Sequence, residues 1–377
     1  MTNSNFIPVN EPVLDGNEKK YLAECIDSGW ISSEGPFVKK FEDLFAKRVN
    51  RKYGIAVCNG SVALDVAVVS LGIGKGDEVI LPTFTIISCA AAIVRAGAIP
   101  VLVDSDPVTW NMDVKLIEEK ITTRTKAIMV VHIYGLPSDM DPILELAAKY
   151  RLMIIEDAAE MHGQLYKGRP CGSFGNISTF SFYPNKHITT GEGGMIVTDD
   201  HQLAEKCRSL RNLCFMPQKR FVHEELGWNF RFTNLQAAIG LAQLERLDEF
   251  VDKKRKIGKY YSEKLAGIPC IQLPLARTDY ADNIYWVYGI VIRNEFPINA
   301  AEAMAALAKL GIGTRPFFYP MHLQPVFKKM NLFLNESYPV SEYLAEKGFY
   351  IPSGLALTFE QMDIVAEKLS IIFKRDS

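Results

Sequence analysis

The stretch from Tyr53 to Met195 alternates short apolar segments with segments of helical periodicity, and this alternation restricts the possible folds most strongly. A strand followed by a covering helix and another strand is typical of parallel β-α-β units, whereas hairpins place strands in direct succession. Strands are predicted at residues 54–58, 78–81, 99–104, 127–132, 152–156, 177–182 and 194–198. Helices are predicted at residues 62–71, 88–96, 141–150 and 201–213. We therefore expect an α/β protein with a mostly parallel seven-stranded sheet.

The second half of the chain indicates a further, smaller unit. A long helical segment is predicted from Leu235 to about Leu265, which is long enough to connect two domains. After it, a strand is predicted at residues 285–292, with helices at residues 299–310 and 359–373. We expect residues 1–245 to form a large domain with an N-terminal arm and residues 246–377 to form a small C-terminal α+β domain.

Lys186 lies in the segment that carries the clearest chemical signal. An apolar, strand-like stretch at residues 177–183 precedes it, and the glycine-rich turn Gly191–Gly194 follows it. A lysine that is desolvated at the end of a buried strand loses its proton more readily, and the neutral amine can form a Schiff base with an aldehyde. Most lysines are solvated and most glycine clusters mark only turns, so this motif indicates a catalytic lysine only if a second motif supports it. We take Lys186 as the candidate catalytic nucleophile.

The second motif is a pair of carboxylates at the end of the strand predicted at residues 152–156. Open α/β sheets bind ligands at the carboxyl ends of their strands, so Asp157 is expected to point into that crevice. Pyridoxal 5'-phosphate (PLP) needs a lysine for its aldehyde and, in many enzymes, an acid that keeps its ring nitrogen protonated. Lys186 and Asp157 match these two needs. The alternative is that Glu156 and Asp157 cap a helix.

Polar residues at two other strand ends could hold a phosphate. Asn59, Gly60 and Ser61 follow a predicted strand and open a helix, whose N-terminal N–H groups attract anions, although such residues are also ordinary helix caps. Ser181 precedes Lys186 by five positions and could add a hydroxyl, or it could simply bond to backbone. Glu160 follows Asp157 by three positions and could bond to the ring hydroxyl of the cofactor.

Composition argues against several classes of protein. The net charge of −2 offers no basic footprint for nucleic acid, and no apolar run reaches the length of a membrane span. The N-terminus lacks the features of a secretory signal, so we expect a cytoplasmic protein. The seven cysteines are scattered without a Cys-x-x-Cys pair, so neither a metal site nor a disulfide framework is expected.

Four segments together resemble the DegT/DnrJ/StrS family of PLP-dependent sugar aminotransferases. They are the Glu-Asp-Ala-Ala-Glu strand end, the segment around Lys186, Gly-x-Asn-x-Arg around Asn229 and the Arg-Pro-Phe-Phe-Tyr-Pro-Met-His run at residues 315–322. The resemblance covers nearly the whole chain and is closest to the GDP-perosamine synthase branch. It implies an aspartate-aminotransferase-type (fold type I) large domain, and a homodimer with shared active sites. It also implies transfer of an amino group, with L-glutamate as donor, to a keto sugar nucleotide such as GDP-4-keto-6-deoxymannose in surface-polysaccharide biosynthesis.

The resemblance also assigns roles to residues. Lys186 would bond covalently to PLP and carry protons, and Asp157 would pair with the ring nitrogen. The phosphate would bind to Gly60, Ser61 and Ser181, with Asn229 reaching the phosphate of the neighbouring subunit. Glu160 and Ile86 would lie against the cofactor ring. The substrate side would be formed by Trp30, Ser32, Arg315, Phe317 and His322.

Two positions depart from the family pattern, and three other functions stay open. Ile86 stands where relatives usually carry an aromatic residue over the ring, and residues 212–216 lack the glycine usual in perosamine synthases. One alternative is an aminotransferase for a small keto-phosphate such as dihydroxyacetone phosphate. A second is a PLP-dependent sugar dehydratase, the branch in which histidine replaces the lysine; here Lys186 is present and His187 follows it. The third is a PLP-binding regulator, which would need a DNA-binding module that the sequence does not show.

Overall fold

The computed structural model describes residues 6–216 and 218–373, and its largest feature is a seven-stranded sheet with the order β1-β9-β8-β5-β4-β2-β3. Its strands are β1 (Tyr53–Val57), β2 (Glu78–Pro82), β3 (Ile99–Val103), β4 (Thr125–Val131), β5 (Met153–Asp157), β8 (Ile177–Ser181) and β9 (Gly194–Thr198). β2, β3, β4, β5 and β8 pair in parallel, whereas β9 is antiparallel to both of its neighbours. The prediction of a mostly parallel seven-stranded α/β sheet is confirmed.

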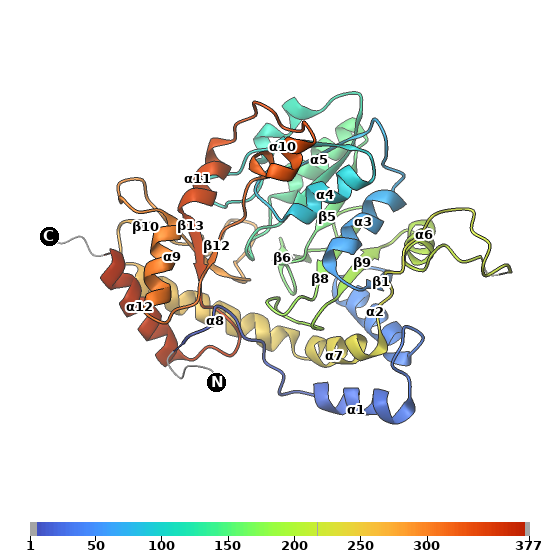
Figure 1. Cartoon of the computed structure of the whole chain (residues 1–377), viewed down its shortest axis with the longest axis horizontal. Coiled ribbons are helices and arrows are strands. Elements are labelled where there is room, and N and C mark those ends of the chain that lie inside the picture. The colour runs from blue at the N-terminus through green and yellow to red at the C-terminus, as the bar shows by residue number, and fades with distance from the viewer. Residues whose placement is uncertain (1–5, 217, 374–377) are drawn as a thin grey trace.

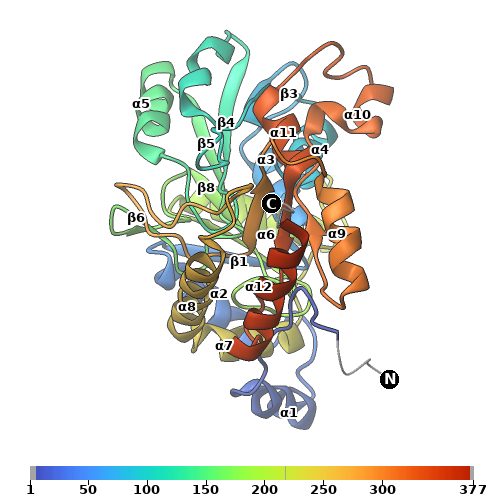
Figure 2. The ribbon, with the colours of Figure 1, turned by 90° about the vertical axis from the view of Figure 1, so that its left-hand side faces the viewer.

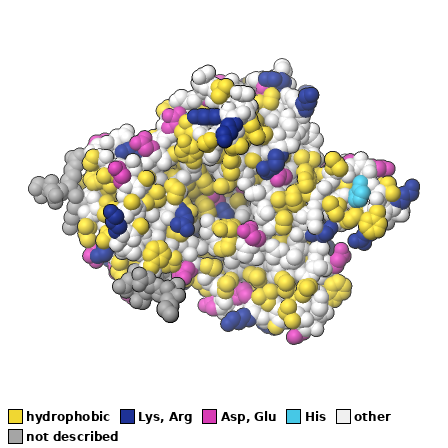
Figure 3. All heavy atoms as spheres, viewed as in Figure 1, with side chains coloured by type: hydrophobic (Ala, Val, Ile, Leu, Met, Phe, Trp, Pro, Cys, Tyr) yellow, Lys and Arg dark blue, Asp and Glu magenta, His cyan; other side chains and the backbone are white. Residues whose placement is uncertain are grey.

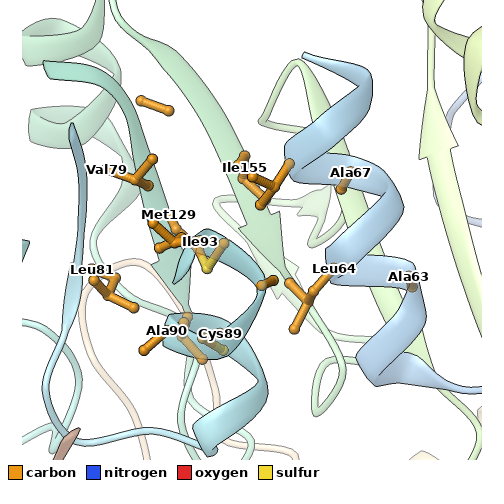
Figure 4. Close-up of a cluster of buried hydrophobic side chains, with 14 of the residues drawn as sticks. Ala63, Leu64, Ala67, Val79, Leu81, Cys89, Ala90, Ile93, Met129 and Ile155 are labelled. Carbon is orange, nitrogen blue, oxygen red and sulfur yellow. The ribbon is translucent and has the colours of Figure 1, made fainter. Parts of the chain in front are cut away.

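Helices cover both faces of this sheet (Figure 1). One face packs against α3 (Gly60–Ser70), α4 (Ile87–Arg95) and α6 (His201–Arg211), and the other against α2 (Pro36–Arg48), α5 (Met140–Tyr150) and α7 (Asn234–Leu244). Alternate strand residues point to opposite faces, so Ile55 and Val57 join the first cluster of buried side chains while Ala56 joins the second. Figure 4 shows Leu64 and Ala67 of α3 and Ile93 of α4 in one cluster with the sheet residues Met129 and Ile155. Burial on both faces explains the continuous apolar runs of the strands.

The small unit is built on a four-stranded antiparallel sheet with the order β10-β11-β13-β12. Its strands are β10 (Ile271–Gln272), β11 (Tyr288–Ile292), β12 (Arg315–Pro316) and β13 (Gly348–Ile351). Helices α8 (Leu247–Leu265), α9 (Ala300–Lys309), α10 (Pro325–Lys329), α11 (Pro339–Lys347) and α12 (Phe359–Phe373) accompany it. Figure 2 shows α12 and α8 on the same side of the unit, where they contact each other. The small unit is therefore α+β, as expected.

The remaining elements are short or lie at the N-terminus. They comprise α1 (Glu18–Ser28), the hairpin of β6 (Leu165–Tyr166) and β7 (Arg169–Pro170), and the 3-10 helices η1 (Val114–Leu116), η2 (Glu118–Lys120) and η3 (Met321–Leu323). Residues 7–11 form an arm that crosses to the small unit, because Ile7 pairs with Ile312 and the Ser353 N–H donates to the carbonyl of Val9. No described helix has both the length and the apolar character that a membrane span requires.

The single helix predicted from Leu235 to Leu265 is wrong, because the chain breaks at Glu245 and Arg246 into α7 and α8. The two helices face different surroundings. α7 packs against α1 and α2 through small residues, among them Gly240, where a side chain would clash with Phe41. α8 is amphipathic and leads to the small unit (Figure 1). The domain division at 245/246 falls at this break, and it stays a prediction.

Candidate active site

The carboxyl ends of the parallel strands surround a cavity of about 830 Å³. This volume lies within the range of about 300–1,000 Å³ that is usual for small-molecule sites. Its wall includes residues from β5, β8, α3, α4 and the small unit, among them Gly60, Ser61, Ile86, Asp157, Glu160, Ser181, Lys186, Trp286, Phe318 and Tyr350. Figure 3 shows apolar and charged side chains interspersed on the face of the molecule seen in Figure 1. Segments that lie far apart in the sequence therefore share one binding surface.

Lys186 lies in the loop after β8, and its side chain is only 10% exposed. Its Nζ is 3.9 Å from Glu160 Oε1 and 3.8 Å from the centre of the Trp286 indole. Burial lowers the pKa of the Lys186 ammonium, and the negative charges of Glu160 and Asp157 oppose that shift. An amine in this setting gives up its proton more easily than a solvated lysine, which suits a nucleophile and proton carrier.

Asp157 ends β5 and is buried at the cavity wall. Its Oδ1 accepts a hydrogen bond from the Ala159 N–H at 3.1 Å, and its Oδ2 accepts one from the Cys89 thiol at 3.2 Å. Burial raises the pKa of Asp157, while these donors and the charge of Lys186 oppose the rise. A positive group beside this carboxylate would favour its ionised form.

Glu160 lies in the loop after β5, and its Oε2 accepts a hydrogen bond from the Tyr134 N–H at 2.6 Å. Burial raises the pKa of Glu160 to about 8, against the pull of Lys186 in the opposite direction. Glu156, the neighbour of Asp157, faces away from the cavity and accepts hydrogen bonds from Phe174 N and Ser178 Oγ. The two adjacent carboxylates therefore differ in role: Glu156 holds a loop, and Asp157 faces the ligand side.

The N-terminus of α3 forms the polar end of the cavity. Asn59 caps the helix through a bond from the Val62 N–H, and Ser61 Oγ lies 2.7 Å from Ser88 Oγ at the start of α4. Gly60 approaches β8 so closely that a Cβ there would lie 2.7 Å from Ser181 Cβ. Free helix N–H groups and hydroxyls at one point are the donors that a phosphate needs.

These residues fit PLP. The cavity offers an amine, a carboxylate and a cluster of phosphate donors on one wall surface, which match the aldehyde, ring nitrogen and phosphate of the cofactor. Two cavity-lining atoms, Thr179 Oγ1 and Asn185 Oδ1, are buried without a hydrogen-bond partner among the described residues. Unpaired buried polar atoms are costly, so a polar ligand at this position would be favourable.

The other residues expected at the site differ in position: one lines the cavity, and the rest do not. Ile86 lines the cavity and is 43% exposed, in keeping with a position beside a ligand. Asn229, Trp30 and Ser32 are exposed and do not line it; Asn229 pairs with Asn212, and the carbonyls of Trp30 and Ser32 accept bonds from Asn234. Arg315 is exposed on β12, opposite the cavity residue Tyr350 on β13.

Phe317 and His322 are buried and are not among the residues that line the cavity of this chain, so their role toward the substrate stays a prediction. The Phe317 ring packs against Phe84 and Tyr134, and it is the next residue, Phe318, that reaches the cavity. Both ring nitrogens of His322 are engaged, Nδ1 with Thr83 Oγ1 and Nε2 with Glu342 Oε1, at 2.9 Å each.

Other cavity residues escaped sequence reasoning. Ser88 lines the cavity, and Cys89 donates a hydrogen bond to the cavity residue Asp157. Both belong to a helix whose apolar pattern hid them, although a serine at a helix start beside Ile86 was a usable signal. Trp286, Phe318 and Tyr350 come from the small unit, and no local motif connects them with Lys186.

Comparison with known proteins identifies the class. The model of the DegT/DnrJ/EryC1/StrS aminotransferase family matches residues 12–370, and the chain belongs to this family. It is 44% identical to the GDP-perosamine synthase of Escherichia coli O157:H7 over 97% of this chain and 98% of that protein. It is 41% identical to the GDP-perosamine synthase of Vibrio cholerae over 95% and 96% of the two chains. Among solved structures, S. venezuelae DesV superimposes with a TM-score of 0.88 at 34% identity, covering 96% of this chain and 95% of that one. The chain is a PLP-dependent aminotransferase of the aspartate-aminotransferase type.

Proposed function

We propose that this enzyme transfers the amino group of L-glutamate to the carbonyl of a keto sugar nucleotide such as GDP-4-keto-6-deoxymannose, in surface-polysaccharide biosynthesis. The observation that carries the proposal is the placement of Lys186 and Asp157 on one cavity wall, in a chain that is 44% identical to a GDP-perosamine synthase over almost its full length. The relatives in Vibrio cholerae and Caulobacter vibrioides have the same name, at 41% and 44% identity.

Each site residue has a separate role in the proposed reaction. Bound PLP supplies an aldehyde that bonds to amines and a ring that accepts the electron pair left behind when a proton leaves carbon. Lys186 is placed to take that proton from the donor amino acid and to return one to the former carbonyl carbon of the acceptor. Asp157 holds the proton on the ring nitrogen. The α3 N-terminus, with Ser61, Ser88 and Ser181, binds the phosphate.

The position of His187 supports amino transfer over dehydration. In the dehydratase branch a histidine would occupy the place of the lysine, whereas here the lysine faces the cavity. His187 is buried outside the cavity lining, and its Nε2–H donates to the carbonyl of Ile284 at 3.2 Å. Burial lowers the pKa of His187 to about 3, so its ring stays neutral and is a poor proton carrier at neutral pH.

We further propose a homodimer with shared active sites. Asn229, Trp30 and Ser32 are exposed and lie outside the cavity of their own chain, which suits residues that complete the cavity of a partner. The segment that follows α6, residues 212–216 and 218–228, projects from the body of the molecule on the right of Figure 1. It carries the exposed side chains Phe221 and Leu226, which a second copy could cover.

A substrate panel tests the proposal. The purified enzyme, loaded with PLP and supplied with L-glutamate, is incubated with GDP-4-keto-6-deoxymannose, a deoxythymidine-diphosphate 4-keto sugar or dihydroxyacetone phosphate, and the release of 2-oxoglutarate is followed. We expect the highest kcat/KM with the GDP sugar and only background with the Lys186→Ala variant. Preferred turnover of dihydroxyacetone phosphate would contradict the sugar assignment, and preference for L-aspartate or L-glutamine would contradict the donor.

A further inference from the structure

Trp286 contacts both Lys186 and the residue before it, although it comes from the small unit and no sequence motif marks it. The face of its indole lies under the lysine, with Nζ 3.8 Å from the ring centre. Its Nε1–H donates a hydrogen bond of 2.8 Å to the carbonyl of Asn185, the residue before the lysine. The side chain is 4% exposed and lines the cavity.

The backbone before Trp286 is held in an uncommon conformation. Tyr285 has a φ of 49°, a left-handed geometry that is unfavourable for a bulky residue. The surroundings hold it there, because the Tyr285 N–H donates to Asn283 Oδ1 at 2.6 Å and the Ile284 N–H donates to the carbonyl of Gly135 at 3.1 Å. Strain that is held so firmly is most common where a side chain must be aimed at a functional group.

The large unit also fits closely around Trp286. Gly135 has a φ of 101°, and a Cβ there would lie 2.6 Å from the backbone nitrogen of Trp286. The indole lies 5.9 Å from the Tyr134 ring and 6.4 Å from the Tyr350 ring, between centres. The orientation of the indole is therefore set by groups from both units.

We propose that Trp286 is a positioning residue for Lys186: its ring face holds the ammonium when the lysine is free of the cofactor, and its N–H fixes the loop that carries it. The proposal rests on the assignment of Lys186 as the reactive lysine. A cation over the face of tryptophan is attracted by the negative charge density of the ring, more strongly where water is excluded. When Lys186 must accept a proton, this face stabilises the charged product.

The other groups that face Lys186 leave room for the indole to stabilise the ammonium form of this lysine. The carboxyls of Glu160 and Asp157, the thiol of Cys89 on α4 and the imidazole of His162 lie near enough to act on the charge of the lysine. The carboxyl of Glu160 lies 3.9 Å from Nζ and attracts the ammonium when it is ionised, but burial raises its pKa to about 8, so only part of this attraction is present at pH 7. Asp157 pairs with the ring nitrogen in the proposed mechanism when PLP is bound, and in cofactor-free enzyme its charge acts on Lys186 equally in every variant at position 286. The indole remains a source of stabilisation that needs no ionised partner.

Three replacements at position 286 separate the two contacts. Trp286→Phe keeps an aromatic face and loses the N–H donor. Trp286→Leu loses both. Site-specific fluorinated tryptophans keep the shape and the N–H but reduce the negative charge on the ring face in steps, so a residue that only fills space would not respond to them.

The measured quantity is the pKa of Lys186 in cofactor-free enzyme, obtained from the pH dependence of its labelling by a lysine-selective reagent and mass spectrometry of the peptide. We expect Trp286→Leu to lower this pKa by about 0.5 to 1.5, the fluorinated series to lower it progressively, and Trp286→Phe to lower it less than Trp286→Leu does. Lys254, a buried lysine outside the cavity, is the internal control and should not change. Fluorination of Trp228, which stacks on Phe230, should leave Lys186 unchanged.

An unchanged pKa of Lys186 across the fluorinated series would overturn the proposal, and that series remains interpretable even if Trp286→Leu fails to fold. Trp286→Phe should in addition release PLP faster than wild type, because the loop has lost its anchor. The labelling result is independent of cofactor chemistry. A failure to find PLP bonded to Lys186 would instead overturn the proposed role of the lysine itself.

Discussion

At the scale of single residues, the site depends on environment more than on residue type. Asp157 and Glu156 are adjacent carboxylates on one strand, yet the pleat turns one toward the cavity and the other toward a loop. The thiol of Cys89 donates a hydrogen bond to Asp157 Oδ2. Burial raises the pKa of the Cys89 thiol well above its usual range, which keeps it protonated as a donor.

Asp157→Asn should retain PLP but lose most of its turnover, because an amide cannot stabilise a positive charge on the ring nitrogen. We expect kcat to fall by about 100-fold or more, in the range of a general acid–base contribution. Stopped-flow absorbance of the bound cofactor after addition of glutamate measures the effect on the first half-reaction. Near-normal rates in this variant would mean that another group keeps the ring nitrogen protonated.

Glu160 should make the cofactor-free enzyme less stable as the pH rises. Its folded pKa of about 8 lies above the usual 4.5, so the folded state binds a proton that the unfolded chain has already released. Below pH 4.5 the proton on Glu160 contributes fully to the free energy of unfolding, and this contribution is lost between about pH 4.5 and 8. Relative to Glu160→Gln, wild type should lose free energy of unfolding on the order of a few kcal/mol over this window. Urea unfolding at several pH values measures it.

The control for this experiment is Glu145→Gln, which changes an exposed carboxyl on α5. The difference between this variant and wild type should be nearly constant with pH. If Glu160→Gln and wild type keep a constant difference as well, Glu160 titrates normally and the buried, mostly neutral carboxyl assumed above is incorrect.

At the scale of elements, strand positions were predictable and connections between units were not. The seven strands of the large sheet follow from apolar runs bounded by turn residues, and the observed bounds differ from the predicted ones by no more than two residues. The break between α7 and α8 was missed because both segments are helical and no proline or glycine separates them at Glu245–Arg246. The capping box at Thr233 and Gln236 marks where α7 begins, but its end is decided by packing.

The close approach of α3 to β8 gives a prediction at this scale. Gly60→Ala should destabilise the enzyme by about 1–3 kcal/mol, because the added methyl meets Ser181 Cβ at 2.7 Å and Ser181 Cα at 3.3 Å. It should also weaken PLP binding, since the helix N-terminus and Ser181 are pushed apart. Gly267→Ala is the matched control, because nothing lies within 4 Å of a Cβ at that position. Thermal unfolding with and without PLP distinguishes the two effects. Normal stability of the Gly60→Ala variant would show that β8 shifts at little cost to accommodate the methyl group.

At the scale of the whole molecule, the sequence pointed to the fold and the cofactor, and the two residues proposed to be central, Lys186 and Asp157, line one cavity. The sequence could not place Trp286, Phe318 or Tyr350 at the site, because these residues come close to Lys186 only when the small unit packs against the large one. Phe317 and His322 are buried in this chain, because a sequence motif does not say which of its residues turns inward, and their role toward the substrate stays a prediction. The roles of Asn229, Trp30 and Ser32 depend on a second copy, so they stay predictions.

The shared-site dimer predicts complementation. Inactive Lys186→Ala protomers mixed with Asn229→Ala protomers should form heterodimers in which one of the two sites contains both intact residues. Random mixing of equal amounts would then recover about a quarter of wild-type activity, since about half of the dimers are mixed and each has one good site. Activity no higher than that of the separate parents, with Asn229→Ala impaired by itself, would place Asn229 in the site of its own chain.

The most direct test of the account is to find the lysine to which PLP is bonded. The enzyme is incubated with PLP, reduced with borohydride and digested, and the modified peptide is identified by mass spectrometry. Among the described residues, two buried lysines have a lowered pKa: Lys186 at the cavity, and Lys254, whose pKa burial lowers to about 7 and whose Nζ donates to the carbonyl of Ser353. The account predicts label on Lys186, loss of the label in Lys186→Ala and retention of the label in Lys254→Met. Stoichiometric label on any other lysine, or label that persists in Lys186→Ala, would contradict it.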